Sequence, residues 1–515
     1  MNVKTHEHGR FYTGLNGHPR FAGSASGVYL MDTIRNELTT SNHRVNGILE
    51  AFLSKFETTS GGSQDVHGDY RSLLQPIACS DIAEIRARFN IYFRHWHPLF
   101  PFLDGKAVHN RLENILQRAE SSSAGFNLTF DSMDDVNGLV WMILLRVIRT
   151  IGGLGRPTKS GISTIERAGE AMSLAYLVLD ANDASTIDDV VTVQALFALQ
   201  LTMYARGWYR PAARLSAITI KIMLEAGLHR CPCRYPSTFQ SDALRDLRKR
   251  IFFSVFVLDR ILSADFGLPL LMRQTDIDVC LPGAVELHGN TPPSDGRKEV
   301  DAESPSSAGQ KRKRSGQQTT NTPIDVYPSN PEGTYSETSP ARTPQKAPAA
   351  KDRLLPARTM AKFAILVGRI VETFNRSRRW RTADPEDALR IRTELDDWWL
   401  ELDRSSVDTH PSSDPLGPHI VLFQCLYHQQ LIRINRHSLS LPATSIHHRH
   451  ALQSTVIAAK AIATCLESGL TNDQQYFKWP GYADMLLDAA LLFAYAATLS
   501  VGGGQSGYVV YTIVC

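Results

Sequence analysis

Large apolar residues recur along this chain at intervals of three and four positions, which is the period of an α-helix. The clearest stripe has spacings of three, four, four, three and four, over Leu244, Leu247, Ile251, Val255, Leu258 and Leu262. Three further stripes span Val136–Ile151, Val190–Tyr204 and Leu215–Ala226, and the last two are followed by Gly207 and Gly227, where helix C-termini are expected. Charged residues between the stripe positions, such as Arg146, Arg149 and Arg248, are expected to point away from the core.

Other segments extend the helical pattern. Helices are predicted around Ile82–Phe93, Thr359–Phe374, Ala388–Leu402, Ile420–Ile434 and Ser454–Ser468. Alternation typical of strands is nearly absent before Gly507. The sequence therefore predicts an all-α fold, and it contains no repeat of fixed period that would indicate a regular solenoid.

The composition changes sharply at Pro282. From Gly283 to about Asp352 the chain is rich in Gly, Pro, Ser, Thr and charged residues, and large apolar residues are few. Such a segment buries too little apolar surface to offset the entropy of ordering, so a long disordered insertion is predicted. We expect a partly ordered N-terminal extension (1–80), core helices (81–282), the insertion (283–352) and a C-terminal helical part of the same body (353–515).

The overall charge and the cysteines limit the class of protein. The 55 Lys and Arg residues nearly balance the 52 Asp and Glu residues, which excludes a strongly basic protein that coats nucleic acid. Seven scattered cysteines do not form a disulfide framework, so a reducing intracellular compartment is expected. The longest apolar stretch, Ala489–Leu499, is shorter than the roughly 20 residues that a membrane span needs, so no membrane association is predicted.

The predicted insertion contains a basic tetrad, which consists of Lys311, Arg312, Lys313 and Arg314. Four exposed cations in a mobile segment fit the acidic groove of an import receptor, so the tetrad is the candidate nuclear localisation signal. The alternative is a solvated charge cluster that no receptor recognises.

Motifs of enzymes are incomplete in this sequence. Asp134-Asp135 and Asn182-Asp183 resemble the magnesium-binding clusters of all-α terpene-synthase-like enzymes, but the first lacks its third carboxylate and Val190 replaces the glutamate of the second. Helix capping and surface charge are the expected roles of these residues. The string from Gly502 to Gly507 matches Gly-x-Gly-x-x-Gly but follows a helix instead of a strand, unlike a dinucleotide-binding loop. We therefore predict no catalytic residues and no enzyme, with a terpene-synthase-like enzyme as a remote alternative.

Histidines and cysteines do not show a recognisable metal-binding spacing. His95 and His97 lie in an aromatic segment that ends a helix, and the histidines at 447, 448 and 450 are expected in a polar loop after Pro442, so packing and surface roles are expected. Cys231-Pro232-Cys233 has one residue between its sulfurs, which is poor geometry for a zinc knuckle. No metal site and no cofactor are predicted within this chain.

Three blocks of residues stand in a characteristic order. The first is Arg88–Phe93, which leads into His97-Pro98-Leu99-Phe100-Pro101-Phe102-Leu103. The second begins at Ala205-Arg206-Gly207-Trp208-Tyr209 and closes on Gly227-Leu228-His229-Arg230, and the third runs from Leu247 through Asp259-Arg260 and Gly267-Leu268-Pro269 to Asp276–Val279. Together the blocks resemble the middle homology region, the regulatory domain, of the fungal-specific transcription factors. The resemblance covers about 82–282 and resumes more weakly at 361–379 and 423–437.

From the residues alone, a structural role is favoured for these motifs. Gly227 and Leu228 supply a helix stop and a core residue, whereas Asp259 and Arg260 are expected on the rim of an apolar helix, where Asp259 could hold Arg248 or Arg260. The alternative is an effector pocket lined by Trp208, Arg210 and Asp259. The full set of family-motif residues is His97, Pro98, Trp208, Gly227, Leu228, His229, Arg230, Asp259, Arg260 and Pro269.

The resemblance implies a nuclear regulator of RNA polymerase II transcription whose helical body responds to a small-molecule effector or to a protein partner. Such factors usually bind DNA through an N-terminal cluster of six cysteines and two zinc ions. The first cysteine here is Cys79, so we expect this chain to lack that cluster and to contain no DNA-binding residues. Two interpretations remain open: an incomplete sequence whose zinc cluster lies upstream, or a cluster-less co-regulator that acts with a partner, the transcription machinery or a second copy.

Overall fold

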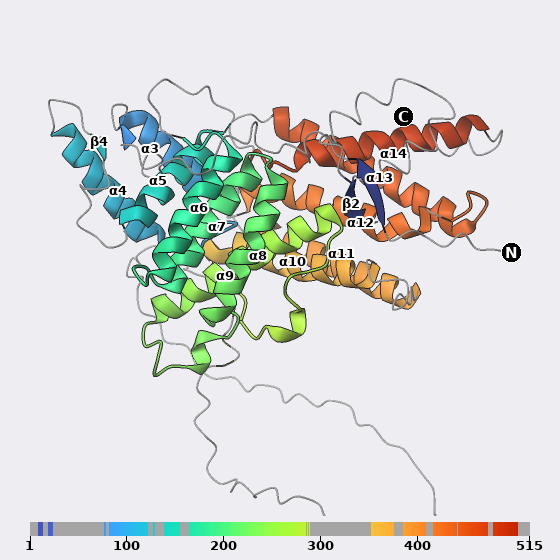
Figure 1. The fold of residues 1–515 in the computed structure, drawn as a ribbon. Coiled ribbons are helices and arrows are strands. Elements are labelled where there is room, and N and C mark those ends of the chain that lie inside the picture. Colours follow the sequence, from blue (N-terminus) through green and yellow to red (C-terminus); the bar gives the residue numbers. More distant parts are fainter. Residues whose placement is uncertain are drawn as a thin grey trace, which may run out of the picture. The chain divides into compact units, whose positions relative to one another are not determined.

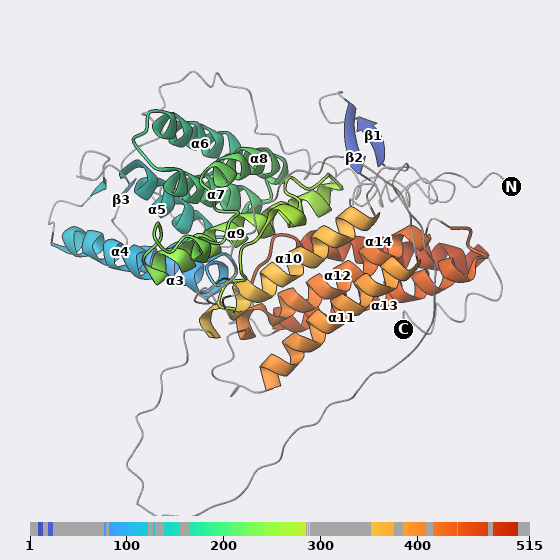
Figure 2. The same cartoon turned by 90° about the horizontal axis from the view of Figure 1, so that it is seen from below.

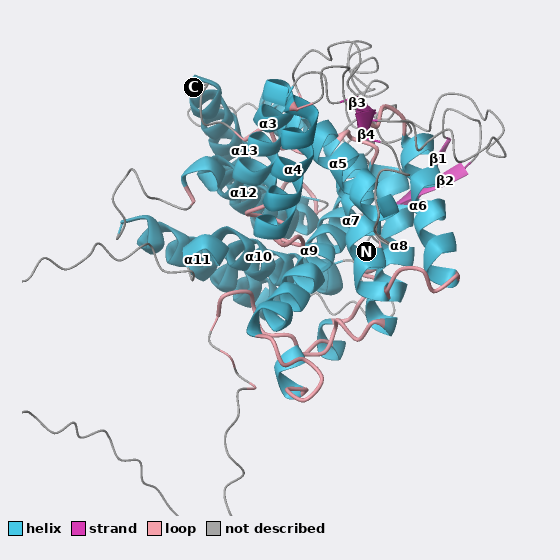
Figure 3. Cartoon of the chain, turned by 90° about the vertical axis from the view of Figure 1, so that its left-hand side faces the viewer, coloured by secondary structure: helices cyan, strands magenta, loops and turns pink. Residues whose placement is uncertain are grey.

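The computed structural model describes residues 82–121, 138–154, 164–284, 286, 288, 352–374, 385–407, 416–439, 441–471 and 477–502, together with four short strands. Helices dominate these ranges (Figures 1 and 3). The strands form two antiparallel pairs, β1 (Gly9–Thr13) with β2 (Pro19–Gly23) and β3 (Ile77–Ala78) with β4 (Asn127–Leu128). The all-α prediction is confirmed, and the short strand pairs are additions that it did not include.

The first set of helices precedes residue 289. It comprises α3 (Ile82–Ile91), α4 (Gly105–Glu120), α5 (Gly138–Gly152), α6 (Ala168–Asp183), α7 (Asp189–Ala205), α8 (Tyr209–Glu225) and α9 (Asp242–Phe266). A π-helical turn, Tyr92–Trp96, continues α3, and 3₁₀ turns lie at Pro232–Arg234 and Gln274–Asp276. Two predicted helix ends are confirmed, because Gly207 and Gly227 adopt left-handed φ angles of 76° and 66° after α7 and α8.

The second set follows residue 351. It comprises α10 (Leu355–Phe374), α11 (Pro385–Val407), α12 (Ile420–Leu439), α13 (Ile446–Thr471) and α14 (Tyr482–Gly502), with 3₁₀ turns at Asp352–Leu354 and Gly417–His419. α13 packs against both α12 and α14, and α11 packs against α10 and α12 (Figure 2). The predicted helices in this part of the chain are present, each longer than its apolar stripe.

Helices from the two sets share one hydrophobic core, which extends from Ile85 to Leu492. α10 lies along α9 (Figure 2), and the described helices on both sides of 289–349 belong to one compact unit. Most of the disordered insertion predicted at 283–352, from 289 to 351 and including the basic tetrad, lies outside the described residues, whereas 283, 284, 286, 288 and 352 are described. The domain boundaries at 80, 282 and 352 therefore stay predictions.

The predicted outward orientation of three arginines is wrong. Arg146 and Arg149 are 3% and 2% exposed and Arg248 is 7% exposed. α5 packs against α3, α6 and α7, so nearly every face of it is covered. The carbonyl of Arg149 accepts a hydrogen bond from Nη1 of Arg88, which is buried as well. Periodicity within one helix cannot reveal that a second and a third helix cover its remaining faces.

Candidate functional site

The first family block forms a turn that neighbouring helices hold by its carbonyl groups. Arg250 of α9 donates hydrogen bonds to the carbonyls of Pro101 and Leu103 at 2.8 and 3.0 Å, and Gln194 of α7 donates to that of Phe102 at 2.7 Å. His97, which precedes Pro98 in this turn, places Nε2 3.2 Å from the Leu103 carbonyl, and burial lowers its pKa to about 4. These contacts hold the turn of the first block by its backbone carbonyls, and its structural role stays a prediction.

The second block ends α8 at Gly227 and leads into a buried Leu228. Arg248 reaches from α9 to this end of α8 and donates to the carbonyl of Ala226 at 2.6 Å, which explains why its side chain is buried. A cation at the C-terminus of a helix is favoured by the helix dipole. Trp208 is half-buried, with the Arg206 guanidinium 5.4 Å from its ring centre.

The charged pair of the third block is buried, contrary to the prediction. Asp259 and Arg260 are 1% and 0% exposed, so they do not lie on the rim of α9. α10 covers this face, where Gly368 leaves room for the Arg260 side chain. Arg260 pairs with Asp259 at 2.6 Å and donates to the carbonyl of Met272 at 2.6 Å, so one of the two partners expected for Asp259 is the one observed. Pro269 lies in an exposed turn after α9.

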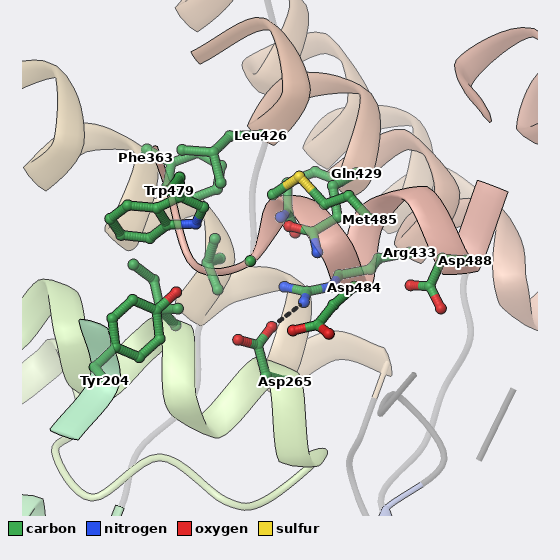
Figure 4. Close-up of a pocket in the computed structure, with 14 residues that line it drawn as sticks. Tyr204, Asp265, Phe363, Leu426, Gln429, Arg433, Trp479, Asp484, Met485 and Asp488 are labelled. Carbon is green, nitrogen blue, oxygen red and sulfur yellow. Dashed lines mark hydrogen bonds and ion pairs between the residues drawn. The ribbon is translucent and has the colours of Figure 1, made fainter. Parts of the chain in front are cut away.

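A polar cavity of about 30 Å³ lies where α7, α9, α10, α12 and α14 meet (Figure 4). Its walls are partly apolar, with Phe363 and Leu426 close to Trp479, and Tyr204 and Met485 also in the lining (Figure 4). Its polar lining consists of Asp265 from α9, Gln429, Gln430 and Arg433 from α12, and Asp484 and Asp488 from α14. Trp208, Arg210 and Asp259, the residues of the alternative effector pocket, do not line this cavity.

Two carboxylates that line this cavity, Asp265 and Asp488, have arginine partners, and the second partner, Arg436, lies outside the lining. Nη2 of Arg433 pairs with Oδ1 of Asp265, and Arg436 lies 4.0 Å from Asp488. Burial raises the pKa of both carboxyl groups, while the neighbouring arginines oppose that shift. Gln430 is fully buried, and within the described residues neither its amide nitrogen nor its amide oxygen has a hydrogen-bonding partner. Such an amide needs a hydrogen-bonding molecule beside it.

The size of the cavity limits what can enter it. A volume of about 30 Å³ accommodates water, which needs roughly 10–15 Å³ on this measure, whereas small-molecule sites are about 300–1,000 Å³. An organic effector would therefore have to separate α9 from α12 and α14 before it could bind. This site is not visible in the sequence, because its charged residues come from three helices. The available signal was an acidic residue beside an apolar run, such as Asp488 before Ala489–Leu499.

Several sequence motifs of enzymes and metal sites have structural contacts. Asn182 and Thr186 hydrogen-bond within the turn between α6 and α7, and the His95 ring stacks on Phe477 at 5.9 Å. Asp134 and Asp135, and the glycine-rich string after Gly502, lie outside the described residues. The prediction of a polar loop at 447–450 is wrong, because these residues form the first turn of α13. His448 is 1% exposed.

One group of side chains has the composition of a metal site. Cys231 lies within 4.8 Å of Cys280 and His288, and also within 4.8 Å of Cys233 and Glu286, measured between potential ligand atoms. The spacing of Cys231 and Cys233 drew attention to two of these residues, but their partners lie about fifty positions further along the chain.

Comparison with known proteins supplies the decisive observation. The model of the fungal specific transcription factor domain matches residues 89–399, which is more than half of the chain. The chain belongs to this family. The predicted family and the prediction of a fungal transcription regulator are therefore confirmed.

Similar proteins carry the names of transcriptional regulators. The chain is 26% identical to the probable transcription factor FUP6 of Fusarium proliferatum, over 97% of this chain and 72% of that protein. It is 24% identical to the transcriptional activator protein acu-15 of Neurospora crassa over 38% of this chain, and 22% identical to the regulatory protein CAT8 of Saccharomyces cerevisiae over 39%. The last two matches span 18% and 15% of those relatives.

Two expectations from the sequence concern membranes and enzymes. Among the helices that the structure describes, none is both long and apolar enough to cross a membrane. Membership of this family favours a regulator over the terpene-synthase-like alternative.

Proposed function

We propose that this chain is the regulatory body of a fungal transcription factor, which acts in the nucleus and changes conformation when an effector or a protein partner binds. The observation that carries this proposal is the small cavity between α9, α12 and α14, which is lined by the largely buried charges of Asp265, Arg433 and Asp488. Enclosing charges between helices costs stability relative to apolar packing. A junction of this kind is sensitive to a change in charge or hydration, as a conformational switch requires.

The chain would act on DNA together with a separate DNA-binding module and with protein partners. The described helices present no cysteine cluster that resembles a binuclear zinc cluster, so a DNA-binding module would come from elsewhere in a longer chain or from a partner. The expected contacts with the transcription machinery, and the possible pairing of two copies, belong to this proposal. The prediction that the chain is not an enzyme also belongs here, and family membership supports it.

A tethering experiment tests the regulatory role. The chain is fused to a bacterial DNA-binding domain, and transcription of a reporter with the matching operator is measured in a fungal host. We expect the fusion to raise or lower transcription relative to the DNA-binding domain alone. We also expect Arg433→Gln to change that effect, whereas Lys221→Ala, at an exposed position on α8, should not. A nuclear, folded fusion without any effect on transcription would contradict the proposal.

A DNA-binding experiment separates the two interpretations of the missing cluster. The chain alone should bind DNA only weakly, with an affinity that falls steeply as salt increases. Tight, sequence-specific binding by this chain would show that it reads DNA without the expected module. Recovery of DNA-binding activity when a candidate partner factor is added would favour the co-regulator.

A further inference from the structure

Two family motifs meet in space, and a cysteine follows each of them. Cys231 follows Gly227-Leu228-His229-Arg230, and Cys280 follows Asp276-Ile277-Asp278-Val279. Asp278 joins the two segments, because its backbone N–H donates to the carbonyl of His229 at 3.4 Å and its carboxylate accepts the N–H of Cys231 at 2.8 Å. The same carboxylate pairs with Arg234 at 2.9 Å. The fold thus fixes the backbone of both cysteines.

The separation of the sulfur atoms suits a metal ion. Sγ of Cys231 and Sγ of Cys280 are 4.0 Å apart, and both lie within 4.8 Å of a ring nitrogen of His288. Two thiolates on a tetrahedral zinc ion, each about 2.3 Å from the metal, would be roughly 3.8 Å apart. A disulfide would require about 2.05 Å between the sulfurs. The two cysteines are 0% and 5% exposed, as expected for a closed structural site.

One ring nitrogen of His288 has a backbone partner. Its Nε2 lies 3.0 Å from the carbonyl oxygen of Asp278. If Nε2 carries the proton and donates a hydrogen bond to this carbonyl, Nδ1 keeps the lone pair that a metal requires. A backbone carbonyl that accepts from the second ring nitrogen is a common partner of histidine ligands. Asp278 would then support both Cys231 and His288.

We propose that Cys231, Cys280 and His288 bind one zinc ion, with the fourth ligand supplied by Glu286 or Cys233. Glu286 accepts a hydrogen bond from Sγ of Cys231 at 3.4 Å, and both candidates lie within 4.8 Å of Cys231. They form a separate group from Cys280 and His288, so the fourth ligand has to turn toward the ion as it binds. Thiolate and imidazole ligands select zinc over magnesium or calcium. This proposal departs from the prediction that the chain holds no metal, because that prediction considered only ligands close together in the sequence.

The charge around the site depends on the fourth ligand. Three anionic ligands and a neutral imidazole leave one net negative charge on the zinc complex. Lys249 of α9, which ion-pairs with Glu286, compensates this charge when Glu286 is the fourth ligand. With Cys233 as the fourth ligand, Lys249 neutralises the free Glu286 carboxylate and the complex stays negative. Each cysteine ligand loses its thiol proton to solvent as the ion binds, so the affinity should fall in acid. The ion would fasten the segment at 278–288 to the turn after α8.

Metal analysis of the untagged full-length chain tests the proposal. After purification with zinc present and extensive dialysis, we expect about one tightly bound zinc ion per chain. Replacement by cobalt(II) should give the visible absorption of a tetrahedral ion and a thiolate-to-metal charge-transfer band. A chain that retains no zinc, or cobalt(II) without a thiolate band, would overturn the proposal. Detection of a Cys231–Cys280 disulfide in place of bound metal would overturn it as well.

Variants locate the ion. Cys280→Ser and His288→Ala should lose the tightly bound zinc, whereas Cys465→Ser, at a half-buried cysteine of α13, should retain it. Glu286→Gln and Cys233→Ser identify the fourth ligand, since only one of them should weaken binding strongly. Circular dichroism reports whether each variant folds, and the cobalt(II) spectrum of the unmodified chain does not depend on any variant. Zinc that persists in Cys280→Ser would place the ion elsewhere and refute the site.

Discussion

Asp265 and Arg433, which are 168 positions apart in the sequence, form an ion pair between α9 and α12. The side chains of Asp265 and Arg433 are 29% and 11% exposed, so the pair is partly accessible to water. Asp484 and Asp488 lie on α14 near the same arginine (Figure 4). The pair therefore connects the helices that precede the undescribed segment at 289–351 with the helices that follow it.

A double-mutant cycle should detect this connection. We expect Asp265→Asn and Arg433→Gln each to lower the free energy of unfolding, and the cycle to give a coupling energy of about 1–2 kcal/mol. Partial exposure keeps this value below that of a fully buried pair. Urea unfolding measures all four free energies. The exposed pair Lys221–Glu225 on α8 is the control, with an expected coupling of about 0.3–0.5 kcal/mol.

A glycine in α5 should be intolerant of any side chain. A Cβ atom at Gly152 would overlap the carbonyl oxygen of Arg88 in α3, and backbone cannot move aside as a flexible side chain can. Gly152→Ala should therefore lower the free energy of unfolding by about 3 kcal/mol or more. Gly169→Ala in α6, where a Cβ would meet nothing within 4 Å, should raise it by about 0.5–1 kcal/mol. Equal effects of the two substitutions would contradict the close packing of α3 on α5.

Helices with large apolar residues at regular intervals of three and four could be predicted from the sequence. α9 and α7 follow the stripes that include Leu258 and Phe197, and glycines mark the ends of α7 and α8. α6 was not predicted, because its buried face consists largely of alanines, whose hydrophobic signal is weak. α4 was also not predicted, although Val108, Leu112 and Ile115 have helical spacing and are buried.

The candidate sites could not be derived from local patterns. Asp265, Arg433 and Asp488 come from three helices, and their proximity depends on how α12 and α14 pack against α9. Pattern reasoning also assigns an arginine to the surface, because it cannot anticipate a specific partner such as the carbonyl of Met272 for Arg260. Cys231 and Cys280 likewise meet only in the folded chain. Each of these polar side chains contacts a group that lies elsewhere in the sequence, so local patterns do not predict its position.

The basic tetrad should direct the protein to the nucleus. Replacing Lys311, Arg312, Lys313 and Arg314 by alanine removes four positive charges that an acidic receptor groove would bind. A fluorescent fusion of the variant should shift toward the cytoplasm in a fungal host. A control variant with Arg342, Lys346 and Lys351 replaced by alanine, in the same predicted insertion, should stay in the nucleus. Unchanged nuclear accumulation of the tetrad variant would remove the import role.

A buried histidine should make the protein less stable in mild acid. His419 is fully buried, its Nε2 lies 2.7 Å from the carbonyl of His95, and burial lowers its pKa to about 4. The unfolded chain binds a proton at this residue near pH 6.5, whereas the folded protein binds it only near pH 4, so acid favours unfolding in this window. Between pH 7 and pH 5 this residue should lower the free energy of unfolding by about 2 kcal/mol.

His419→Gln isolates that contribution, because its amide can still donate to the His95 carbonyl but does not titrate. Urea unfolding at pH 7 and at pH 5 should show a smaller loss of stability for the variant than for the unmodified chain, by about 2 kcal/mol. His447→Gln, at an exposed position of α13, should retain the loss seen in the unmodified chain. If the His419 variant lost as much stability in acid as the unmodified chain, the histidine would not be held neutral by its burial.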